Sequence, residues 1–160
     1  MNVTPAQRRY LGIEAIISAA INAVFSIVFV FLVFGSSARV AQGAIAWDAV
    51  PQTFMIAFMA TLIPTLLTKK RIRAGTLQPR VGRRSRLPRQ TVLRAIAVAV
   101  VATAVAGPLA GILLRLGPID WPFWPVLIAK TVYGALLGAV IGAFAAYTAL
   151  GNTVISAETA

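Results

Sequence analysis

The chain has 160 residues, of which 59% are hydrophobic and only 12% are charged, and its formal net charge is +11. Soluble domains carry about 25% charged residues, so this composition indicates a membrane protein. Because the sequence has neither Cys nor His and only four scattered acidic residues, we expect no metal site, no cofactor and no enzymatic activity.

Four long apolar segments predict an all-α, polytopic membrane protein with a bundle of four transmembrane helices. A hydrocarbon core of ~30 Å needs ~20 helical residues at ~1.5 Å each. The segments cover about residues 10–34, 51–68, 91–116 and 125–150, and we assign residues 1–160 to a single membrane domain. The first segment exceeds the ~7–15 apolar residues of a signal peptide, so we treat it as a span rather than a cleaved leader.

A polar stripe runs along one face of the first span. Residues four apart are neighbours on a helix surface, and this spacing holds Glu14, Ser18, Asn22 and Ser26. Its side chains form hydrogen bonds to neighbouring helices or back to their own backbone, or the stripe is a site for a ligand or ion. Glu14 has two interpretations. It pairs near the membrane surface with Arg8, Arg9 or a base of the basic loop 69–90, or it couples the transport of a proton or cation.

The connections before the second and fourth spans share a spacing of Trp and Pro. Trp47 precedes Pro51, and Trp121 precedes Pro125, by the same interval. Trp anchors at the membrane interface, and Pro is tolerated in the first turn of a helix. The pattern predicts two helical hairpins, which arose either by duplication of one unit or with a matching spacing that is coincidence.

A basic stretch separates the second and third spans. Between Thr68 and Arg94 it holds ten Lys or Arg residues and no acidic residue. By the positive-inside rule, these charges place loop 69–90 and both termini in the cytoplasm. We expect its bases to contact anionic lipid headgroups as well, in particular Lys69, Lys70, Arg71, Arg73, Arg83, Arg84 and Arg86. An acidic cytoplasmic protein is the alternative partner. Nucleic acid is not expected, because no aromatic residues lie between the bases for stacking.

Glycines form small-residue stripes on the third and fourth spans. The third span has Gly107 and Gly111, and the fourth has a tandem GxxxG pattern of Gly134, Gly138 and Gly142. Such stripes let helix backbones approach closely, so they predict helix packing. Arg115 and Lys130 lie at the outer ends of the same stripes. If these spans are packed neighbours, the two cations either reach lipid phosphates separately or form one outer-leaflet site for an anionic headgroup or ligand.

Three segments resemble a group of uncharacterised bacterial inner-membrane proteins built from two-helix hairpins. The segments are AINAVFSIVFVFLVFG, FMIAFMATLIPTLLTKKRIRAG and LIAKTVYGALLGAV. The resemblance covers about residues 1–75, departs in the second hairpin, and implies a bacterial membrane hairpin without an activity or site residues. Glu14 is also similar to the first-helix glutamate of the small multidrug transporters, whose other motifs this chain lacks.

These patterns lead to two hypotheses about function. The first is a non-enzymatic accessory or lipid- or ligand-binding bundle in the bacterial inner membrane, which packs with lipid, with itself or with a larger membrane complex. The second is a small oligomeric transporter or channel that uses the polar face of the first span, with Glu14, Ser18 and Asn22.

Overall fold

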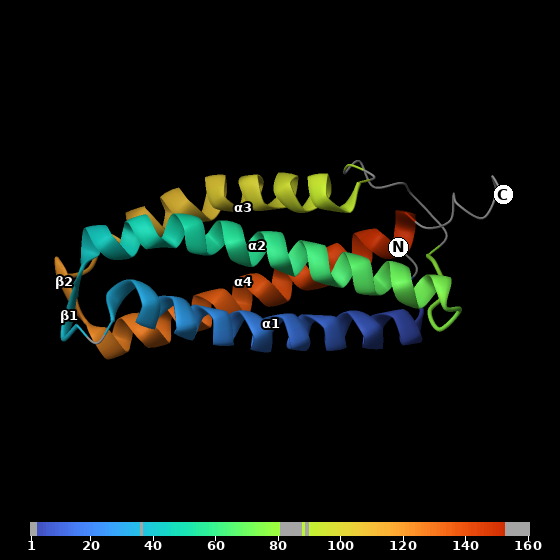
Figure 1. Ribbon diagram of the computed structural model, residues 1–160, viewed down its shortest axis with the longest axis horizontal. Coiled ribbons are helices and arrows are strands. Elements are labelled where there is room, and N and C mark those ends of the chain that lie inside the picture. Colours follow the sequence, from blue (N-terminus) through green and yellow to red (C-terminus); the bar gives the residue numbers. More distant parts are fainter. Residues whose placement is uncertain (1–2, 36, 81–87, 89, 153–160) are drawn as a thin grey trace.

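The structure, a computed structural model, describes residues 3–35, 37–80, 88 and 90–152. These residues form four helices and two short strands, in the order α1 (Pro5–Phe34), β1 (Arg39–Ala41), α2 (Gln42–Arg73), α3 (Thr91–Leu114), β2 (Asp120–Pro122) and α4 (Phe123–Asn152) (Figure 1). All four helices are long and apolar enough to cross a membrane. The predicted all-helical fold with four candidate spans is therefore confirmed.

Local signals explain where α1 begins and ends. The Thr4 side chain accepts a hydrogen bond from the Gln7 amide at 3.2 Å, and the Gln7 side chain accepts one from the Thr4 amide at 3.0 Å. This reciprocal capping box leaves Pro5 in the first turn, where its missing N–H costs nothing. After Phe34 the chain leaves the helix at Gly35, whose φ of 59° suits a residue without a Cβ.

Helix α2 is longer than the sequence predicted. It begins at Gln42 rather than at residue 51, so Pro51 lies inside the helix together with Pro64. The prediction that Pro51 occupies the first turn is therefore wrong. Prolines are tolerated within membrane helices because neighbouring groups satisfy the freed carbonyls. At its other end α2 continues to Arg73, so the first four bases of the predicted loop are helical.

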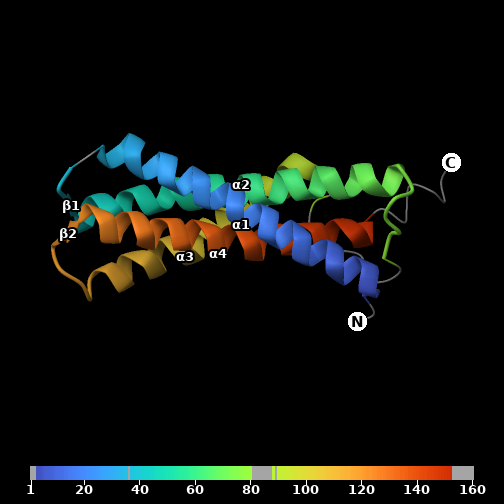
Figure 2. The same cartoon turned by 90° about the horizontal axis from the view of Figure 1, so that it is seen from below.

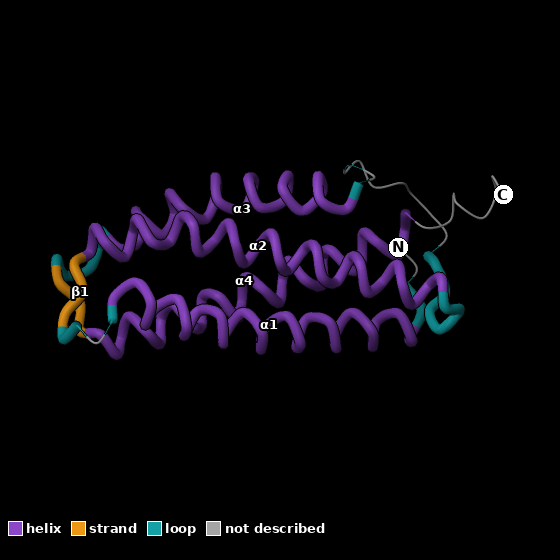
Figure 3. Tube along the Cα trace, in the orientation of Figure 1, coloured by secondary structure: helices purple, strands orange, loops and turns teal. Residues whose placement is uncertain are grey.

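Two three-residue strands, which the sequence did not reveal, join the connections before α2 and α4. They pair antiparallel with Val40 opposite Trp121. Two further backbone bonds extend the pairing, from the Gln42 amide to the Ile119 carbonyl at 2.8 Å and from the Phe123 amide to the Ala38 carbonyl at 3.2 Å. This β clip closes one end of the bundle (Figure 3).

The helices pack in a different order from that expected. Helix α1 lies along α4, and α2 lies along both α3 and α4, whereas α1 and α2 touch little. Across the bundle the order is therefore α3, α2, α4, α1 (Figures 1 and 2). The prediction of hairpins in which the first helix packs on the second and the third on the fourth is wrong. The main contacts join the two halves of the chain.

The two halves nevertheless have matching architecture. Exchanging α1 with α3 and α2 with α4 leaves the pattern of packing unchanged. The strand register makes Gln42, the first residue of α2, equivalent to Phe123, the first residue of α4. Trp47 lies inside α2 while Trp121 lies in β2, so the Trp–Pro spacing that suggested a repeat does not occupy equivalent positions.

The bundle is apolar outside and polar or small inside. Large aliphatic residues such as Ile16 and Leu32 expose 71% and 76% of their surface, whereas Ala57, Ala99 and Ala145 are fully buried. A soluble protein could not present such an exterior to water, because burial of large apolar side chains drives its folding. In lipid the exterior costs nothing, and small interior residues allow close helix contact.

Candidate functional site

The polar stripe of α1 lies in the interior of the bundle. Its four side chains are all buried, namely those of Glu14, Ser18, Asn22 and Ser26. The stripe is therefore withdrawn from the apolar exterior of the bundle. Asn22 Nδ2 donates to the carbonyl of Ser18 in the same helix at 2.7 Å, and Ser26 accepts a hydrogen bond from Gln52 of α2.

The glycines of α4 lie directly against this stripe. A Cβ on Gly138 would lie 2.8 Å from the Asn22 Cβ, and a Cβ on Gly142 would lie 2.6 Å from the Ser18 Cβ. A Cβ on Gly134 would overlap the Ser26 Oγ and would lie 3.1 Å from both the Asn22 carbonyl oxygen and the Ser26 Cβ. Because any side chain would collide here, the tandem GxxxG of α4 is the surface on which the polar face of α1 packs.

The two glycines of α3 differ from each other. A Cβ on Gly107 would make an ordinary 3.8 Å contact with Val50 of α2, and a Cβ on Gly111 would meet nothing within 4 Å. Gly107 therefore faces the α2 contact, whereas Gly111 does not have a packing role within the described chain.

Lys130 lies inside the bundle, bound to α2. Its ammonium group donates to Asp48 Oδ2 at 2.5 Å and to Gln52 Oε1 at 2.7 Å. Gln52 Nε2 in turn donates to Ser26 Oγ at 3.1 Å, so α4, α2 and α1 are joined by one chain of hydrogen bonds. This is the only ion pair within the described residues.

Arg115 and Lys130 do not form a common site. Lys130 is buried against α2, whereas Arg115 is exposed at the C-terminal cap of α3, which packs on α2 rather than on α4. The assumption that α3 and α4 are packed neighbours is wrong, and with it the geometry that would have paired these cations. Asp48 serves as the counter-charge, and the carbonyl of Asp120 accepts from Arg39 at 3.3 Å.

Glu14 lies in the half of the bundle away from the β clip, and only 1% of its surface is exposed. Its Oε1 has no hydrogen-bond partner, and no described base forms an ion pair with it. Arg8 and Arg9 are exposed and do not provide the predicted pairing. One turn earlier, Tyr10 uses its hydroxyl to reach Thr68 Oγ1 of α2 at 2.9 Å. The Tyr10 hydroxyl is also a neighbour of the Glu14 carboxylate, so Oε1 is the one oxygen of this carboxylate that is buried without a hydrogen-bond partner among the described residues.

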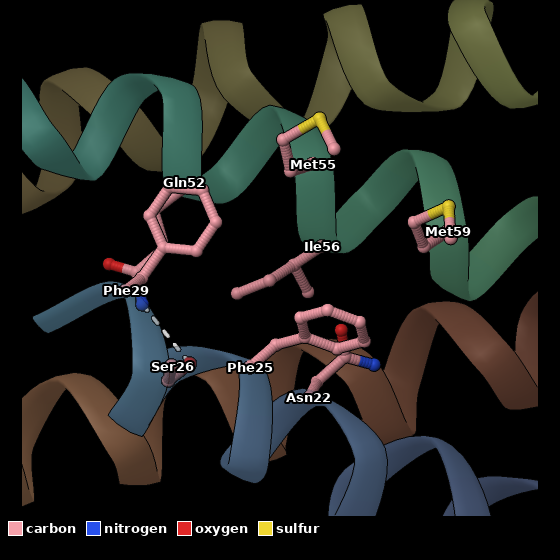
Figure 4. Close-up of a pocket in the computed structure, with 8 residues that line it drawn as sticks. All are labelled: Asn22, Phe25, Ser26, Phe29, Gln52, Met55, Ile56 and Met59. Atoms are coloured by element: carbon pink, nitrogen blue, oxygen red, sulfur yellow. Dashed lines mark hydrogen bonds between the residues drawn. The ribbon is translucent and has the colours of Figure 1, made fainter. Parts of the chain in front are cut away.

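Two adjoining cavities lie in the groove between α1 and α2, where these helices touch little. The first has an almost entirely apolar surface (Figure 4). It is lined by Asn22, Phe25, Ser26, Phe29, Gln52, Met55, Ile56 and Met59. The second shares Asn22 and Met59 with the first and continues to Glu14. We call this continuous feature the α1–α2 groove.

The groove is small and opens towards the exterior. Its two cavities have volumes of about 70 and 60 Å³, well below the ~300–1,000 Å³ of a pocket for a drug-sized molecule. Phe25 and Met55 of its walls expose 46% and 44% of their surface. The groove therefore has room for only a small chemical group, and its walls are open to the exterior of the bundle.

The predicted lipid-contact bases divide into two groups. Lys69, Lys70, Arg71 and Arg73 belong to the final turns of α2, and Arg71 also lies over the Tyr10 ring at 5.0 Å. The remaining three, Arg83, Arg84 and Arg86, lie outside the described residues. In the part of the chain that the structure does describe, no three His, Cys, Asp or Glu side chains are grouped to hold a metal ion.

Sequence reasoning missed Asp48 and Gln52 as partners of Lys130. The sequence did contain a signal. Asp48 and Gln52 begin a row of residues spaced four apart, which goes on through Ile56, Ala60 and Pro64 and forms a buried face of α2. It was overlooked because the second span was assumed to begin at residue 51. The methionine and phenylalanine walls of the groove had no distinguishing pattern among the many apolar residues.

Comparisons with protein-family models, with curated proteins and with solved structures found no match. The resemblance to bacterial two-helix membrane proteins therefore stays a prediction.

Proposed function

We propose that this protein is a non-enzymatic integral membrane protein whose α1–α2 groove binds the polar end of an amphipathic ligand. The observation that carries the proposal is the unpartnered Oε1 of Glu14, buried beside a groove with apolar walls. An isolated buried carboxylate is costly unless something pairs with it. A cationic or hydrogen-bond-donating headgroup would supply the partner, and its apolar chain would remain in lipid.

Orientation and partners belong to the same proposal. The start of α1, the end of α2 and the start of α3 lie together at the end of the bundle opposite the β clip (Figure 1), and they carry most of the described bases. Trp47 and Trp124 are exposed near the clip, as expected at a membrane interface. We place the basic end and both termini in the cytoplasm of a bacterial cell, in the inner membrane. Anionic lipids, a second copy or a larger membrane complex are the proposed partners, and nucleic acid is not among them.

The groove is tested with a single-chain cation of simple structure. Radiolabelled dodecyltrimethylammonium is equilibrated with the protein in nanodiscs, and binding is compared between the original chain and two variants. Glu14→Gln should weaken binding about tenfold or more, because a charge-assisted contact is lost. Asp120→Asn removes an exposed carboxylate at the far end and should leave binding unchanged. Equal binding by Glu14→Gln and the original chain would contradict the proposal.

Transport is the second candidate function, favoured by the line of buried polar groups along the bundle. The line runs from Asp48 and Lys130 near the clip, through the α1 stripe, to Tyr10 and Thr68 near the basic end. Reconstituted liposomes distinguish the two functions. Uptake of the same labelled cation that is driven by a proton gradient, and is lost in Glu14→Gln, would establish transport. Binding without uptake would leave the accessory or ligand-binding role.

A further inference from the structure

Arg94 is a buried base that the groove does not use. It lies in the first turns of α3, on the face that packs on α2, and exposes 1% of its surface. Its Nε donates to the carbonyl of Pro88 at 3.3 Å, which holds the guanidinium at the N-terminal end of the helix. Both Nη atoms are buried and have no hydrogen-bond partner. A guanidinium presents five donors, and burying most of them unpaired is strongly unfavourable.

A second base lies beside Arg94. Lys69, in the final turns of α2, donates to Thr91 Oγ1 of α3 at 2.8 Å. Arg94 and Arg73 lie close enough to add further positive charge around it. Two further cations thus lie around Lys69, where the last turns of α2 meet the first turns of α3.

The N-terminus of α3 adds to this positive potential. The N-cap residue Gln90 makes no side-chain hydrogen bond to the first turn, so the free amides of that turn are not capped in the usual way. A helix N-terminus carries about half a positive charge and is a favourable place for an anion. Of the acids that the structure describes, Asp48 and Asp120 lie towards the β clip, and Glu14 is buried on α1.

We propose that Arg94, Lys69 and Thr91 form a specific binding site for a phosphate group between α2 and α3. The donor set favours phosphate, because a guanidinium can bind two of its oxygens in parallel while an ammonium and a hydroxyl reach the others. The phosphate comes either from a phospholipid headgroup at the membrane surface or from a free phosphate in solution. This site is independent of the groove and of Glu14.

A specific site differs measurably from the general attraction of lipid to surface bases. Lys70 neighbours Lys69 in the sequence and is exposed, so Lys70→Gln removes the same charge without touching the site. It is the matched control for Lys69→Gln. Arg94→Lys keeps the charge of Arg94 and removes the fork that binds two oxygens.

The experiment measures ligand binding to the delipidated, full-length protein in an uncharged detergent. Dioleoyl phosphatidylglycerol and inorganic phosphate are titrated separately, and binding is followed by native mass spectrometry and by the shift in melting temperature. Lys69→Gln, Arg94→Gln and Arg94→Lys should each weaken binding about tenfold or more, and Lys70→Gln less than about twofold. A response to the lipid alone identifies a headgroup site, and a response to inorganic phosphate identifies a site for a soluble anion.

Stability of the unliganded protein gives a second readout that does not depend on the ligand's source. Arg94→Met removes an unpaired buried charge, so without ligand it should melt higher than the original chain, yet gain nothing when ligand is added. Equal loss of binding in Lys70→Gln and Arg94→Gln would reduce the effect to general surface attraction and overturn the proposal.

Discussion

Lys130 illustrates how a single residue can have opposite roles in sequence and in structure. On the sequence it looks like a cation at the membrane edge, where long side chains reach lipid phosphates. In the structure it is buried and bound to Asp48 and Gln52. In lipid the bare charge would be too costly to hide, so its retention depends on both partners. Its burial therefore makes Lys130 a structural link between α4 and α2.

Removing one member of this pair should be worse than removing both. Asp48→Asn and Lys130→Met should each destabilise the bundle by about 3–5 kcal/mol, because each leaves an unbalanced polar group buried. The double variant Asp48→Leu with Lys130→Met should recover most of that loss. Unfolding in a denaturing detergent, arranged as a double-mutant cycle, measures the coupling. Single effects that simply add would show that the pair does not interact energetically.

At the scale of helices, the interface between α1 and α4 is the most closely fitted. Polar residues of α1 occupy the space that the missing side chains of the α4 glycines leave. The closeness is specific to this pair, because Gly111 of α3 has open space around it. Helix length and apolar composition do not predict this difference between the glycines, because it depends on which helix packs against each of them.

Alanine substitution separates these two kinds of glycine. Gly138→Ala should lower the melting temperature, because the new methyl group would overlap the side chain of Asn22. Gly111→Ala meets no atoms and should raise stability slightly, by up to about 1 kcal/mol, through helix propensity. Both are compared by thermal unfolding in the same detergent. A smaller loss from Gly138→Ala than from Gly111→Ala would be inconsistent with the packing described.

The sequence predicted the helices well and their contacts poorly. The length of an apolar segment is enough to predict a helix that could span a membrane, so all four such helices were found. Intervals of four identified the buried face of α1. The choice of partner depends on how small and polar faces fit one another, which one chain's periodicity does not encode. That is why the pairing of Asp48 with Lys130, the unpartnered Glu14 and the burial of Arg94 were not foreseen.

For the whole molecule, the uneven distribution of bases predicts a fixed direction of insertion. The chain contains no Cys, so single-cysteine variants can be labelled without background. Ser37 is exposed beside β1 and Ala74 is exposed at the end of α2. In intact bacterial cells a membrane-impermeant maleimide should label Ser37→Cys and leave Ala74→Cys unmodified until the cells are opened. The reverse pattern would place the basic end outside.

The β clip has a mechanical consequence for the groove. It joins the connections that lead into α2 and α4 at one end only, with hydrogen bonds on both sides of the paired strands. A helix of 30 residues such as α1 is ~45 Å long, at ~1.5 Å per residue. If α1 pivots about the clipped end, that end stays in place, whereas a rotation of about 5° displaces the far end by ~4 Å. Glu14 lies in the far half of α1, so in such a rotation it would separate from α2 by more than the clipped end would, once the hydrogen bond between Tyr10 and Thr68 is broken.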